Sequence, residues 1–303
     1  MKVLVTGANG FIGRSLVDAL RSRNINFVLT TREGGDVSNE PSIRTGDLSV
    51  FDGWMDCLDG IDVIVHLASQ AGYCADTSID AYMGNNIQII RRMLISAKSK
   101  GVKRFIFISS IKVNGETTKA MPFQHSHKSL PEDLYSLSKM VSEQLLYETS
   151  AKSDLEVVVI RPPLVYGPGV KANFQRLLSL AGLPLPFASI NNRRDMVSVY
   201  NLCDLIVTCI DHPEAKNQTF LVSDGRSHSL AELLSTINHV QGRRSWLWSF
   251  PVPCLSLILK LLGKRVFAQR LLGNLEIDIS HTTATLDWYP RYTLENTLRK
   301  MQL

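Results

Sequence analysis

Two side chains four residues apart could perform acid–base chemistry. Tyr135 and Lys139 stand in the stretch YSLSK, and in a helix this spacing places both side chains on one face. An ammonium group beside a phenol lowers the phenol pKa, which lets the tyrosine give or take a proton near neutral pH. The pair therefore predicts proton transfer by Tyr135, assisted by Lys139.

A serine hydroxyl could complete this catalytic set. Ser110 follows an apolar run in FISSIKVNG and lies 25 residues before Tyr135. Its hydroxyl can hold a carbonyl oxygen while a hydride moves to or from a nicotinamide ring. A tyrosine and a lysine at this spacing are also common on exposed helices, so the catalytic interpretation depends on a neighbouring dinucleotide site.

Three glycines near the amino terminus predict that dinucleotide site. They stand in TGANGFIG, between a β-branched run and an amphipathic stretch. Glycines at this spacing permit a tight turn, close approach of backbone N–H groups to a pyrophosphate, and close packing of a helix on a strand. The expected cofactor contacts in this turn are Gly7, Gly10, Phe11, Ile12 and Gly13.

The end of the second expected strand bears on the choice of cofactor. An NAD site usually has an acidic residue there for the ribose hydroxyls, whereas this chain has Thr30-Thr31-Arg32. Arg32 can hold a 2′-phosphate through two hydrogen bonds, and Arg14 can approach the same group. Solvated surface arginines are the alternative. We expect NADP(H) rather than NAD(H), contacted by Arg14, Thr31 and Arg32.

The first half of the chain alternates short β-branched runs with longer amphipathic stretches. This order is typical of βαβ units, and it predicts an α/β fold with a Rossmann-type, doubly wound parallel sheet. The expected strands are Lys2–Thr6, Asn26–Thr30, Val63–Leu67, Arg104–Ser109 and Glu156–Ile160. The expected helices are Gly13–Arg23, Ala81–Lys100 and Tyr135–Ala151.

The pattern changes after Arg161-Pro162-Pro163, where Pro and Gly interrupt short elements. We expect a dinucleotide-binding domain over residues 1–165 and a smaller, mainly substrate-binding lobe over residues 166–303. Segments near 190–225 should return to the first domain, with Thr219–Val222 close to its sheet.

Composition excludes several classes of function. The formal net charge is +5, but basic residues form no run of the kind that nucleic-acid-binding proteins carry, so we expect no nucleic-acid partner. The five cysteines include no C-x-x-C pair, so we expect reduced packing residues and no metal site. The glycine turn follows the first methionine so closely that a signal peptide is not expected, which favours a cytoplasmic location.

One apolar segment, Trp246–Leu262, invites a membrane interpretation. It is shorter than the roughly 20 apolar residues that a bilayer span needs, and Pro251, Pro253 and Lys260 interrupt it. We expect a buried helix and no stable membrane span, with association at a membrane surface as the alternative.

Taken together, these motifs resemble the extended short-chain dehydrogenase/reductases, in particular the NAD(P)-dependent sugar-nucleotide epimerase/dehydratase family, over essentially the whole chain. Asp47 in TGDLS resembles the family aspartate that binds the adenine amino group, and Asn86 resembles the asparagine that supports the catalytic site. His66-Leu67-Ala68 resembles the strand end that lies along the cofactor. The resemblance thus implies further cofactor contacts from Asp47, Leu48, Leu67, Ala68, Asn86 and Pro162.

The resemblance also implies a nucleotide-sugar site. RPPLVYGPG is similar to the family motif that passes the nicotinamide, with Leu164 in place of the usual Asn. Asn173 and Arg194 resemble ligands of the diphosphate, and Asp278 matches a position near the nucleoside. Arg270 is either a second phosphate ligand or a surface arginine. The full set of expected substrate contacts is Ser69, Lys112, Asn173, Arg194, Arg270 and Asp278.

Within the family, the residues after Ser110 argue against a dehydratase. Dehydratases have an Asp-Glu pair there, whereas this chain has Ile111-Lys112. Epimerases retain NAD and return the same hydride, and Thr31-Arg32 argues against that arrangement. The pattern is most similar to the 4-ketoreductases that form UDP-N-acetylquinovosamine from UDP-4-keto-6-deoxy-N-acetylglucosamine for surface polysaccharide, whose members often carry the name UDP-glucose 4-epimerase.

Two other functions stay open. The first is a UDP-hexose or UDP-N-acetylhexosamine 4-epimerase, and the second is a non-catalytic NADP-binding sensor, although a sensor tends to lose the catalytic Tyr or Lys that this chain keeps. The resemblance further implies a homodimer that pairs through a four-helix bundle including the Tyr135–Lys139 helix.

Overall fold

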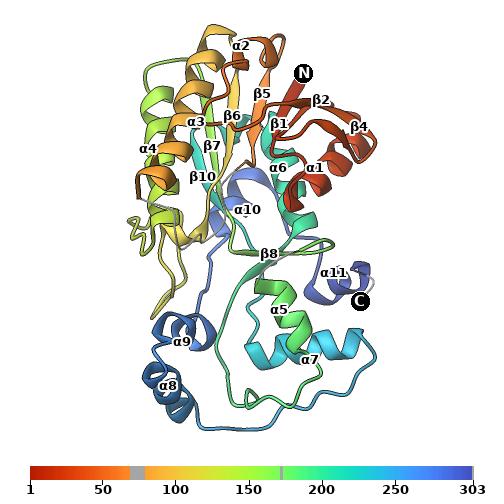
Figure 1. The fold of residues 1–303 in the computed structure, drawn as a ribbon, viewed down its shortest axis with the longest axis vertical. Coiled ribbons are helices and arrows are strands. Elements are labelled where there is room, and N and C mark those ends of the chain that lie inside the picture. Colours follow the sequence, from red (N-terminus) through yellow and green to blue (C-terminus); the bar gives the residue numbers. More distant parts are fainter. Residues whose placement is uncertain (69–78, 171–172, 302–303) are drawn as a thin grey trace.

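The computed structural model describes residues 1–68, 79–170 and 173–301. Its centre is an eight-stranded sheet with the strand order β10-β7-β6-β5-β1-β2-β4-β3. All neighbouring strands run parallel except β3, which is antiparallel to β4. Helices α3 and α4 cover one face of the sheet and α1 and α6 cover the other (Figure 1). The expected Rossmann-type α/β fold is confirmed.

The strands of this sheet are short and mostly buried. They are β1 (Lys2–Thr6), β2 (Asn26–Thr31), β3 (Gly35–Val37), β4 (Glu40–Arg44), β5 (Val63–His66), β6 (Arg104–Ile108), β7 (Glu156–Arg161) and β10 (Gln218–Leu221). Two further strands, β8 (Leu164–Tyr166) and β9 (Met196–Ser198), pair with each other in a separate sheet. All five expected strands are present, with ends within one residue of the prediction.

The helices follow the strands as βαβ units require. They are α1 (Phe11–Ser22), α2 (Trp54–Cys57), α3 (Ile79–Ser99), α4 (Leu134–Ser150), α5 (Asn173–Leu180), α6 (Val199–Asp211), α7 (Leu230–Val240), α8 (Val252–Leu261), α9 (Arg265–Leu272), α10 (Ser280–Leu286) and α11 (Leu294–Lys300), with 3₁₀ turns η1 (Ile111–Val113) and η2 (Pro213–Ala215). The three expected helices α1, α3 and α4 are confirmed to within two residues.

Continuous apolar runs explain why the central strands lie where they do. The four residues Val157–Ile160 of β7 and the three residues Val3–Val5 of β1 have no exposed surface. Such runs suit strands with helices on both faces. The chain crosses from β2 on one side of β1 to β5 on the other, and a crevice for a ligand forms at the carboxyl ends of the strands at such a switch point.

The β3–β4 hairpin was not predicted. Its strands have three and five residues, and its turn places Ser38 and Asn39 at positive φ, 50° and 65°. Two such residues match the tight turns that join antiparallel strands. Polar residues on a short edge strand leave no hydrophobic alternation to detect, which is why the sequence did not indicate the hairpin.

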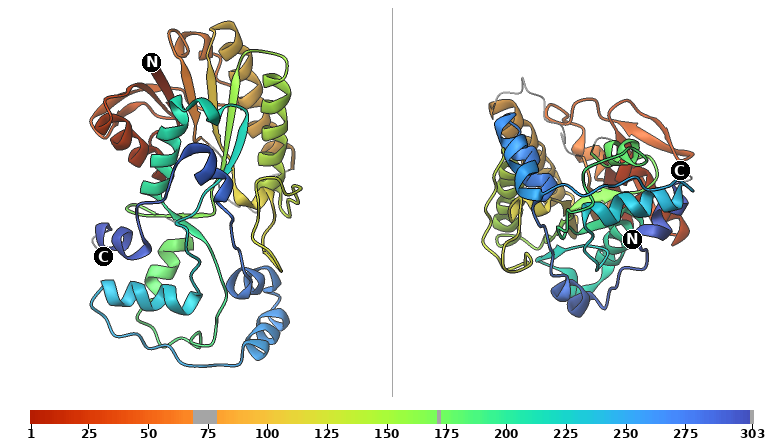
Figure 2. Two further views of the ribbon diagram at one scale, coloured as in Figure 1. Left: turned by 180° about the vertical axis from the view of Figure 1, so that it is seen from behind. Right: turned by 90° about the horizontal axis from the view of Figure 1, so that it is seen from below.

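After β8 the chain builds most of a second, mainly helical part. Seen from behind, α5, α7, α8 and α9 gather at the end remote from the sheet (Figure 2), and their apolar side chains form a separate core cluster. Segment β9–α6–β10 runs back to the large sheet, where β10 pairs with β7. The proposed boundary near residue 165 stays a prediction.

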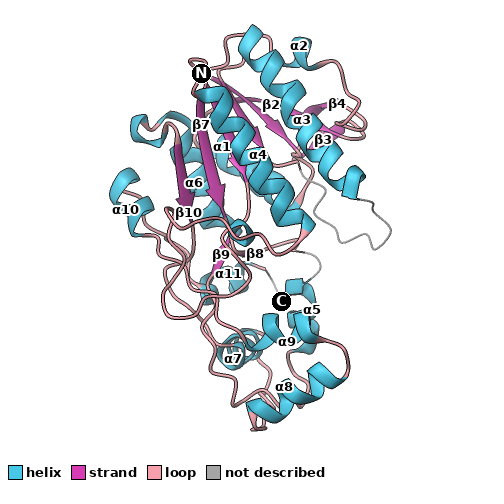
Figure 3. Ribbon diagram, turned by 90° about the vertical axis from the view of Figure 1, so that its left-hand side faces the viewer, coloured by secondary structure: helices cyan, strands magenta, loops and turns pink. Residues whose placement is uncertain are grey.

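The prediction of a buried helix in Trp246–Leu262 is wrong. Within α8 only Leu255 is fully buried, while Leu257, Ile258 and Leu261 are exposed. The helix lies at the outer end of the molecule (Figure 3), where one face packs on the core and nothing described covers the other. Among the described residues, no helix combines the length and apolarity that crossing a membrane requires.

Three cysteines follow the prediction of packing residues and one does not. Cys57, Cys203 and Cys209 are buried, whereas Cys254 is exposed because it lies on the outer face of α8. Cys74 lies outside the described residues.

Candidate active site

Helix α4 begins with a capping arrangement that fixes its first turn. The Asp133 carboxylate accepts a hydrogen bond from the Ser136 backbone N–H at 2.8 Å, and the Ser136 hydroxyl accepts one from the Asp133 N–H at 3.2 Å. Such reciprocal caps satisfy N–H groups that a helix start otherwise leaves unpaired. Tyr135, half-buried, lies in this turn. The cap therefore holds the tyrosine backbone rigidly.

Lys139 lies one turn further along α4, pointing at the end of β6. Its Nζ donates a hydrogen bond to the Ile108 carbonyl oxygen at 2.8 Å, lies 4.5 Å from the Phe107 ring centroid, and lies 5.9 Å from the Tyr135 ring centroid. Burial lowers the Lys139 pKa to about 7, against the opposing charge of Glu143. The structure thus brings the predicted Tyr–Lys pair together beside the sheet.

Ser110 follows β6 at the same edge. Its hydroxyl accepts a hydrogen bond from the Lys112 N–H at 3.3 Å and caps η1, and the Ile111 N–H donates to the Pro162 carbonyl at 3.0 Å. Ser110 and Pro162 therefore stand together beyond the carboxyl ends of β6 and β7, the edge at which α4 presents Lys139.

A buried ion pair supports this edge. The Arg161 guanidinium donates to both carboxylate oxygens of Glu143, at 3.0 and 2.5 Å, and to Asn114 Oδ1 at 2.9 Å. Glu143 stands four residues after Lys139, so the two share the inner face of α4. Glu143 and Asn114 were not predicted from the sequence. The available signal was an acidic residue one turn after Lys139 on a face that must be buried.

Asn86 of α3 is linked by hydrogen bonds to the part of α4 that carries Tyr135. Its side-chain amide donates to Ser138 Oγ at 3.2 Å, and that hydroxyl donates to the Tyr135 carbonyl at 2.8 Å. These contacts suit a supporting role for Asn86 behind Tyr135.

The glycine turn packs the start of α1 against the ends of β1 and β5. A Cβ on Gly13 would lie 2.4 Å from the Gly7 carbonyl oxygen, and one on Gly7, whose φ is +73°, would lie 2.8 Å from the Ala68 nitrogen. Gly10 caps α1 without a side-chain hydrogen bond. The turn therefore offers backbone N–H groups at a helix start, which is the arrangement that holds a pyrophosphate.

Other predicted cofactor residues surround this turn. Phe11, Ile12 and Leu67 are half-buried against the core, and the Ala68 N–H lies 3.5 Å from Thr6 Oγ1. His66, buried beneath them, shares a 2.7 Å hydrogen bond with Thr6. Burial and the charge of Lys139 lower the His66 pKa to about 3, so this imidazole is neutral.

The residues expected at the adenosine end have mixed environments. Thr31 is buried, and its hydroxyl accepts from the Gly34 N–H at 3.0 Å. Arg32 is exposed at the end of β2. The Arg14 guanidinium folds back onto Asn9, donating to its backbone oxygen at 3.3 Å and to its side-chain oxygen.

Asp47 lies close to the end of β2. The Thr45 N–H donates to the Thr31 carbonyl and the Gly46 N–H donates to the Arg32 carbonyl. These two hydrogen bonds hold the loop before Asp47 alongside the end of β2. Hydrogen bonds from Ser49 lower the Asp47 pKa, so the carboxylate is ionised. Leu48 packs half-buried against the core.

Two of the expected substrate contacts belong to a charge cluster of Lys112, Glu116, Asp133 and Arg270. Lys112 Nζ lies 2.7 Å from Glu116 and 2.8 Å from Asp133, and the Arg270 guanidinium lies 2.9 Å from Glu116. Burial opposes ionisation of Glu116, but hydrogen bonds from Lys112 and Arg270 outweigh it and lower the pKa. Neither carboxylate of this cluster, Glu116 or Asp133, was predicted from the sequence.

Of the remaining substrate candidates, Arg194 lies near the charge cluster, whereas Asp278 lies apart from it. Arg194 donates to the Gly273 carbonyl at 2.9 Å. Burial lowers the pKa of its guanidinium, and the nearby charges act in opposite directions, since Glu116 raises that pKa and Arg270 lowers it. Asp278 accepts from Gln124 Nε2 at 3.0 Å and lines a separate hollow of about 720 Å³ with Arg193 and Asp195. Ser69 lies outside the described residues, and so does the side chain of Asn173, the first residue of α5.

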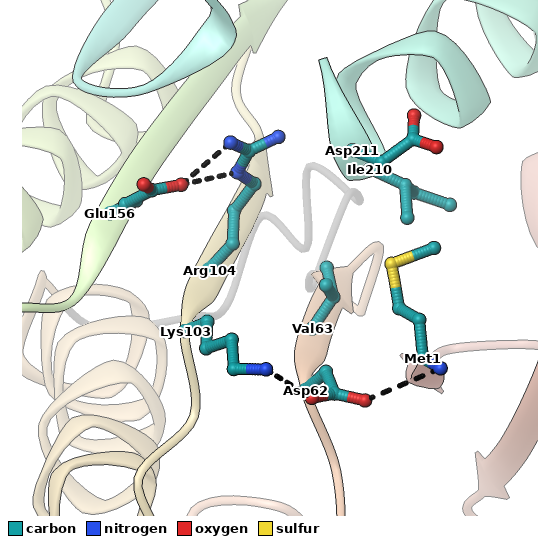
Figure 4. Close-up of a pocket in the computed structure, with 8 residues that line it drawn as sticks. All are labelled: Met1, Asp62, Val63, Lys103, Arg104, Glu156, Ile210 and Asp211. Atoms are coloured by element: carbon teal, nitrogen blue, oxygen red, sulfur yellow. Dashed lines mark hydrogen bonds and ion pairs between the residues drawn. The ribbon is translucent and has the colours of Figure 1, made fainter. Parts of the chain in front are cut away.

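A smaller hollow of about 280 Å³ lies at the opposite, amino edge of the sheet (Figure 4). Two ion pairs lie among its lining residues: Lys103 with Asp62 at 3.0 Å, and Arg104 with Glu156 at 2.6 Å. Because the predicted catalytic side chains Ser110, Tyr135 and Lys139 are not among its lining residues, this hollow is separate from the candidate active site.

Comparison with known proteins agrees with this geometry. Residues 3–223 match the NAD dependent epimerase/dehydratase family. A Vibrio cholerae protein named UDP-glucose 4-epimerase is 42% identical over 302 residues, which cover 97% of this chain and 92% of that protein.

Two solved structures share the fold of this chain at less than 25% sequence identity. The UDP-glucose 4-epimerase of Thermotoga maritima with UDP-glucose has a TM-score of 0.80 at 20% identity, covering 99% of this chain and 97% of that one. The UDP-glucuronic acid 4-epimerase of Bacillus cereus with NAD has a TM-score of 0.80 at 23% identity, covering 99% and 95%. By its family match and its sequence identity to the Vibrio protein, this chain is an enzyme of the NAD-dependent epimerase/dehydratase family.

Proposed function

We propose that this enzyme reduces the C4 ketone of a nucleotide sugar with NADPH. The preferred substrate is UDP-4-keto-6-deoxy-N-acetylglucosamine, giving UDP-N-acetylquinovosamine for surface polysaccharide. The observation that carries this proposal is the position of Lys139, whose Nζ is held at the Ile108 carbonyl on the edge that also presents Tyr135 and Ser110.

Each of the three side chains has a role in that reduction. When bound, NADPH supplies the hydride that reaches C4. The Ser110 hydroxyl donates a hydrogen bond to the ketone oxygen and stabilises the negative charge that develops there. Tyr135 delivers its phenol proton to the same oxygen, which completes the alcohol, and Lys139 stabilises the phenolate that is left.

The charge cluster supports a reductase over a dehydratase. Dehydration needs an acid and a base close to C5 and C6 of the sugar. The residue after Ser110 is an isoleucine, and the next, Lys112, is engaged by Glu116 and Asp133. Both carboxyl groups have lowered pKa values, so neither is a proton donor near neutral pH.

The preference for NADPH rests on the end of β2. Arg32 is exposed there and no acidic residue follows Thr31 directly, so a 2′-phosphate would meet a cation rather than a carboxylate. The family name and the NAD-bound Bacillus structure favour NAD instead. Titrating the ligand-free protein with NADPH and with NADH distinguishes the two.

A 4-epimerase of UDP-hexoses or UDP-N-acetylhexosamines is the second candidate. It is favoured by the name of the Vibrio protein at 42% identity. An epimerase needs the same Ser, Tyr and Lys but retains its dinucleotide and consumes none.

One pair of incubations separates the two activities. The purified enzyme is given UDP-N-acetylglucosamine or UDP-glucose without added cofactor, and separately the 4-keto-6-deoxy sugar with NADPH. The reductase oxidises one NADPH for each ketone and leaves C4 of the first two sugars unchanged. Inversion at C4 without cofactor use rejects the reductase. Tyr135→Phe is the matched control, and full activity in that variant would reject catalysis by this site altogether.

Two further properties are proposed: the cytoplasmic location expected from the sequence, and, on the family resemblance, a homodimer formed through the helix that carries Tyr135 and Lys139.

A further inference from the structure

The outer end of the molecule carries a group of exposed apolar side chains on α8, on the residue that ends it and on the segment before it. We call this group the α8 face. Each member is between 45% and 78% exposed, and α8 lies at the end farthest from the large sheet (Figure 1). The α8 face consists of Trp246, Trp248, Leu257, Ile258, Leu261 and Leu262.

The backbone of the preceding segment explains why both tryptophans point outward. The Trp248 N–H donates to the Leu185 carbonyl at 3.0 Å, and the Leu185 N–H donates to the Trp246 carbonyl at 3.3 Å. In extended chain, successive side chains point to opposite sides. Leu247 therefore packs on the core, and the residues on either side of it face outward.

The helix itself is apolar on more of its surface than the core can cover. Leu255 and Leu259 pack on the core, whereas Leu257, Ile258 and Leu261 share the other side at helical spacing. A helix that is apolar around most of its circumference is normally buried. Large contiguous apolar patches on a folded protein mark interaction sites.

The charges of this region identify the kind of partner. Residues 233–275 contain no Asp or Glu and six basic residues: Arg243, Arg244, Lys260, Lys264, Arg265 and Arg270. Since the formal net charge of the chain is +5, the residues outside this segment sum to −1. The whole positive excess of the protein therefore lies in the segment that carries the α8 face.

Exposed cations flank the apolar side chains directly. Arg243, Arg244, Lys260 and Lys264 are all exposed. The Arg244 guanidinium lies 4.9 Å from the Trp246 ring centroid. An apolar surface with tryptophans and a basic border is suited to the boundary between lipid headgroups and acyl chains.

We propose that the α8 face docks on the surface of an anionic lipid bilayer. With ten residues, α8 is too short to span a bilayer, so it lies in the headgroup region with Leu257, Ile258 and Leu261 toward the acyl chains. A second copy of the chain would bring two basic borders together, whereas anionic headgroups neutralise the border. This inference does not depend on the proposed reaction, because the α8 face is separate from Tyr135, Lys139 and Ser110.

Vesicle sedimentation tests the proposal. The full-length enzyme is mixed with vesicles of phosphatidylcholine alone and with vesicles of equal parts phosphatidylcholine and phosphatidylglycerol. We expect at least tenfold more sedimented protein with the anionic vesicles, and we expect high salt to remove most of that difference. Equal sedimentation with both vesicles, or none with either, overturns the proposal.

Two kinds of variant probe the two parts of the surface. Trp246→Ser/Trp248→Ser removes apolar anchors, and Lys260→Glu/Lys264→Glu reverses part of the border. Both should lower binding to anionic vesicles at least tenfold while turnover of a soluble substrate stays unchanged. Val50→Ser/Met121→Ser is the matched control, since it removes two exposed apolar side chains elsewhere and should bind like the unmodified protein.

Light scattering tests the alternative that a second copy of this chain, rather than a lipid bilayer, covers the α8 face. If the tryptophan variant converts a dimer into a monomer, and vesicle binding is absent in the unmodified protein, the α8 face is a surface between copies and the lipid proposal is wrong. Loss of vesicle binding in the tryptophan variant, with the oligomeric mass unchanged, supports it.

Discussion

The Lys139 ammonium nitrogen donates a hydrogen bond to the backbone carbonyl oxygen of Ile108 at 2.8 Å. Ile108 is the last residue of β6, and Ser110 follows two residues later. This hydrogen bond therefore ties the Tyr135–Lys139 helix directly to the strand that precedes Ser110. The three side chains are preorganised by the packing of α4 on the sheet.

Replacing Lys139 by Met should change how stability depends on pH. The folded-state pKa is about 7, below the usual 10.5, so between these values the unfolded chain binds more protons than the folded one. The free energy of unfolding therefore gains about 2 to 3 kcal/mol from this group between pH 7 and pH 9. Lys139→Met lacks that gain. Urea unfolding of both ligand-free proteins at the two pH values measures it, and a pH-independent difference between them would contradict the assigned pKa.

Gly13→Ala should weaken dinucleotide binding. Its Cβ would lie 2.4 Å from the Gly7 carbonyl oxygen and 2.5 Å from that of Ala8, and backbone atoms cannot yield easily. We expect a loss of about 1–3 kcal/mol in stability from overpacking, together with cofactor affinity at least tenfold weaker. Gly10→Ala, with a nearest contact of 3.1 Å, should be milder.

Fluorescence titration with NADPH and chemical unfolding measure both effects of the Gly13 change. Asp18→Ala, on the solvent side of the same helix, should alter neither. Normal affinity in Gly13→Ala would show that the helix start is not the phosphate site.

Glu143→Ala should destabilise the protein strongly. The change leaves the Arg161 guanidinium buried without its carboxylate partner, which costs about 3–5 kcal/mol. The matched control is Glu295→Ala, which breaks an exposed pair with Arg299 and should leave stability almost unchanged. Denaturant unfolding at pH 7.5 compares them. Similar small losses in both variants would mean that the buried pair does not hold α4 to β7.

Arg32→Ser should weaken NADPH binding by about 10- to 100-fold, because a charge-assisted contact to the 2′-phosphate is lost. NADH binding should stay the same, since NADH lacks that phosphate. Lys103→Ser removes an exposed cation at the amino edge of the sheet and serves as the control. Equal weakening of both cofactors by Arg32→Ser would reject a 2′-phosphate site at the end of β2.

Local patterns account for the parts of the molecule that could be predicted. Apolar runs and helical periodicity located the central strands and the helices on either side, and a four-residue spacing identified Tyr135 and Lys139. Each of these signals depends only on residues near one another in the chain.

Long-range relationships account for what was missed. Glu143 with Arg161 and Glu116 with Arg270 become neighbours only once the sheet and the lobe have formed. The apolar pattern of α8 predicts that something covers the helix, but the pattern does not specify whether the cover is the protein core or an external partner.

The proposed reduction is tested most directly by following the hydride. The enzyme is incubated with UDP-4-keto-6-deoxy-N-acetylglucosamine and NADPH that carries deuterium at both C4 positions of the nicotinamide. One deuterium at C4 of the sugar product, with one NADPH oxidised per molecule, is the predicted result. A sugar without deuterium, or C4 inversion of UDP-N-acetylglucosamine with no NADPH consumed, would contradict it.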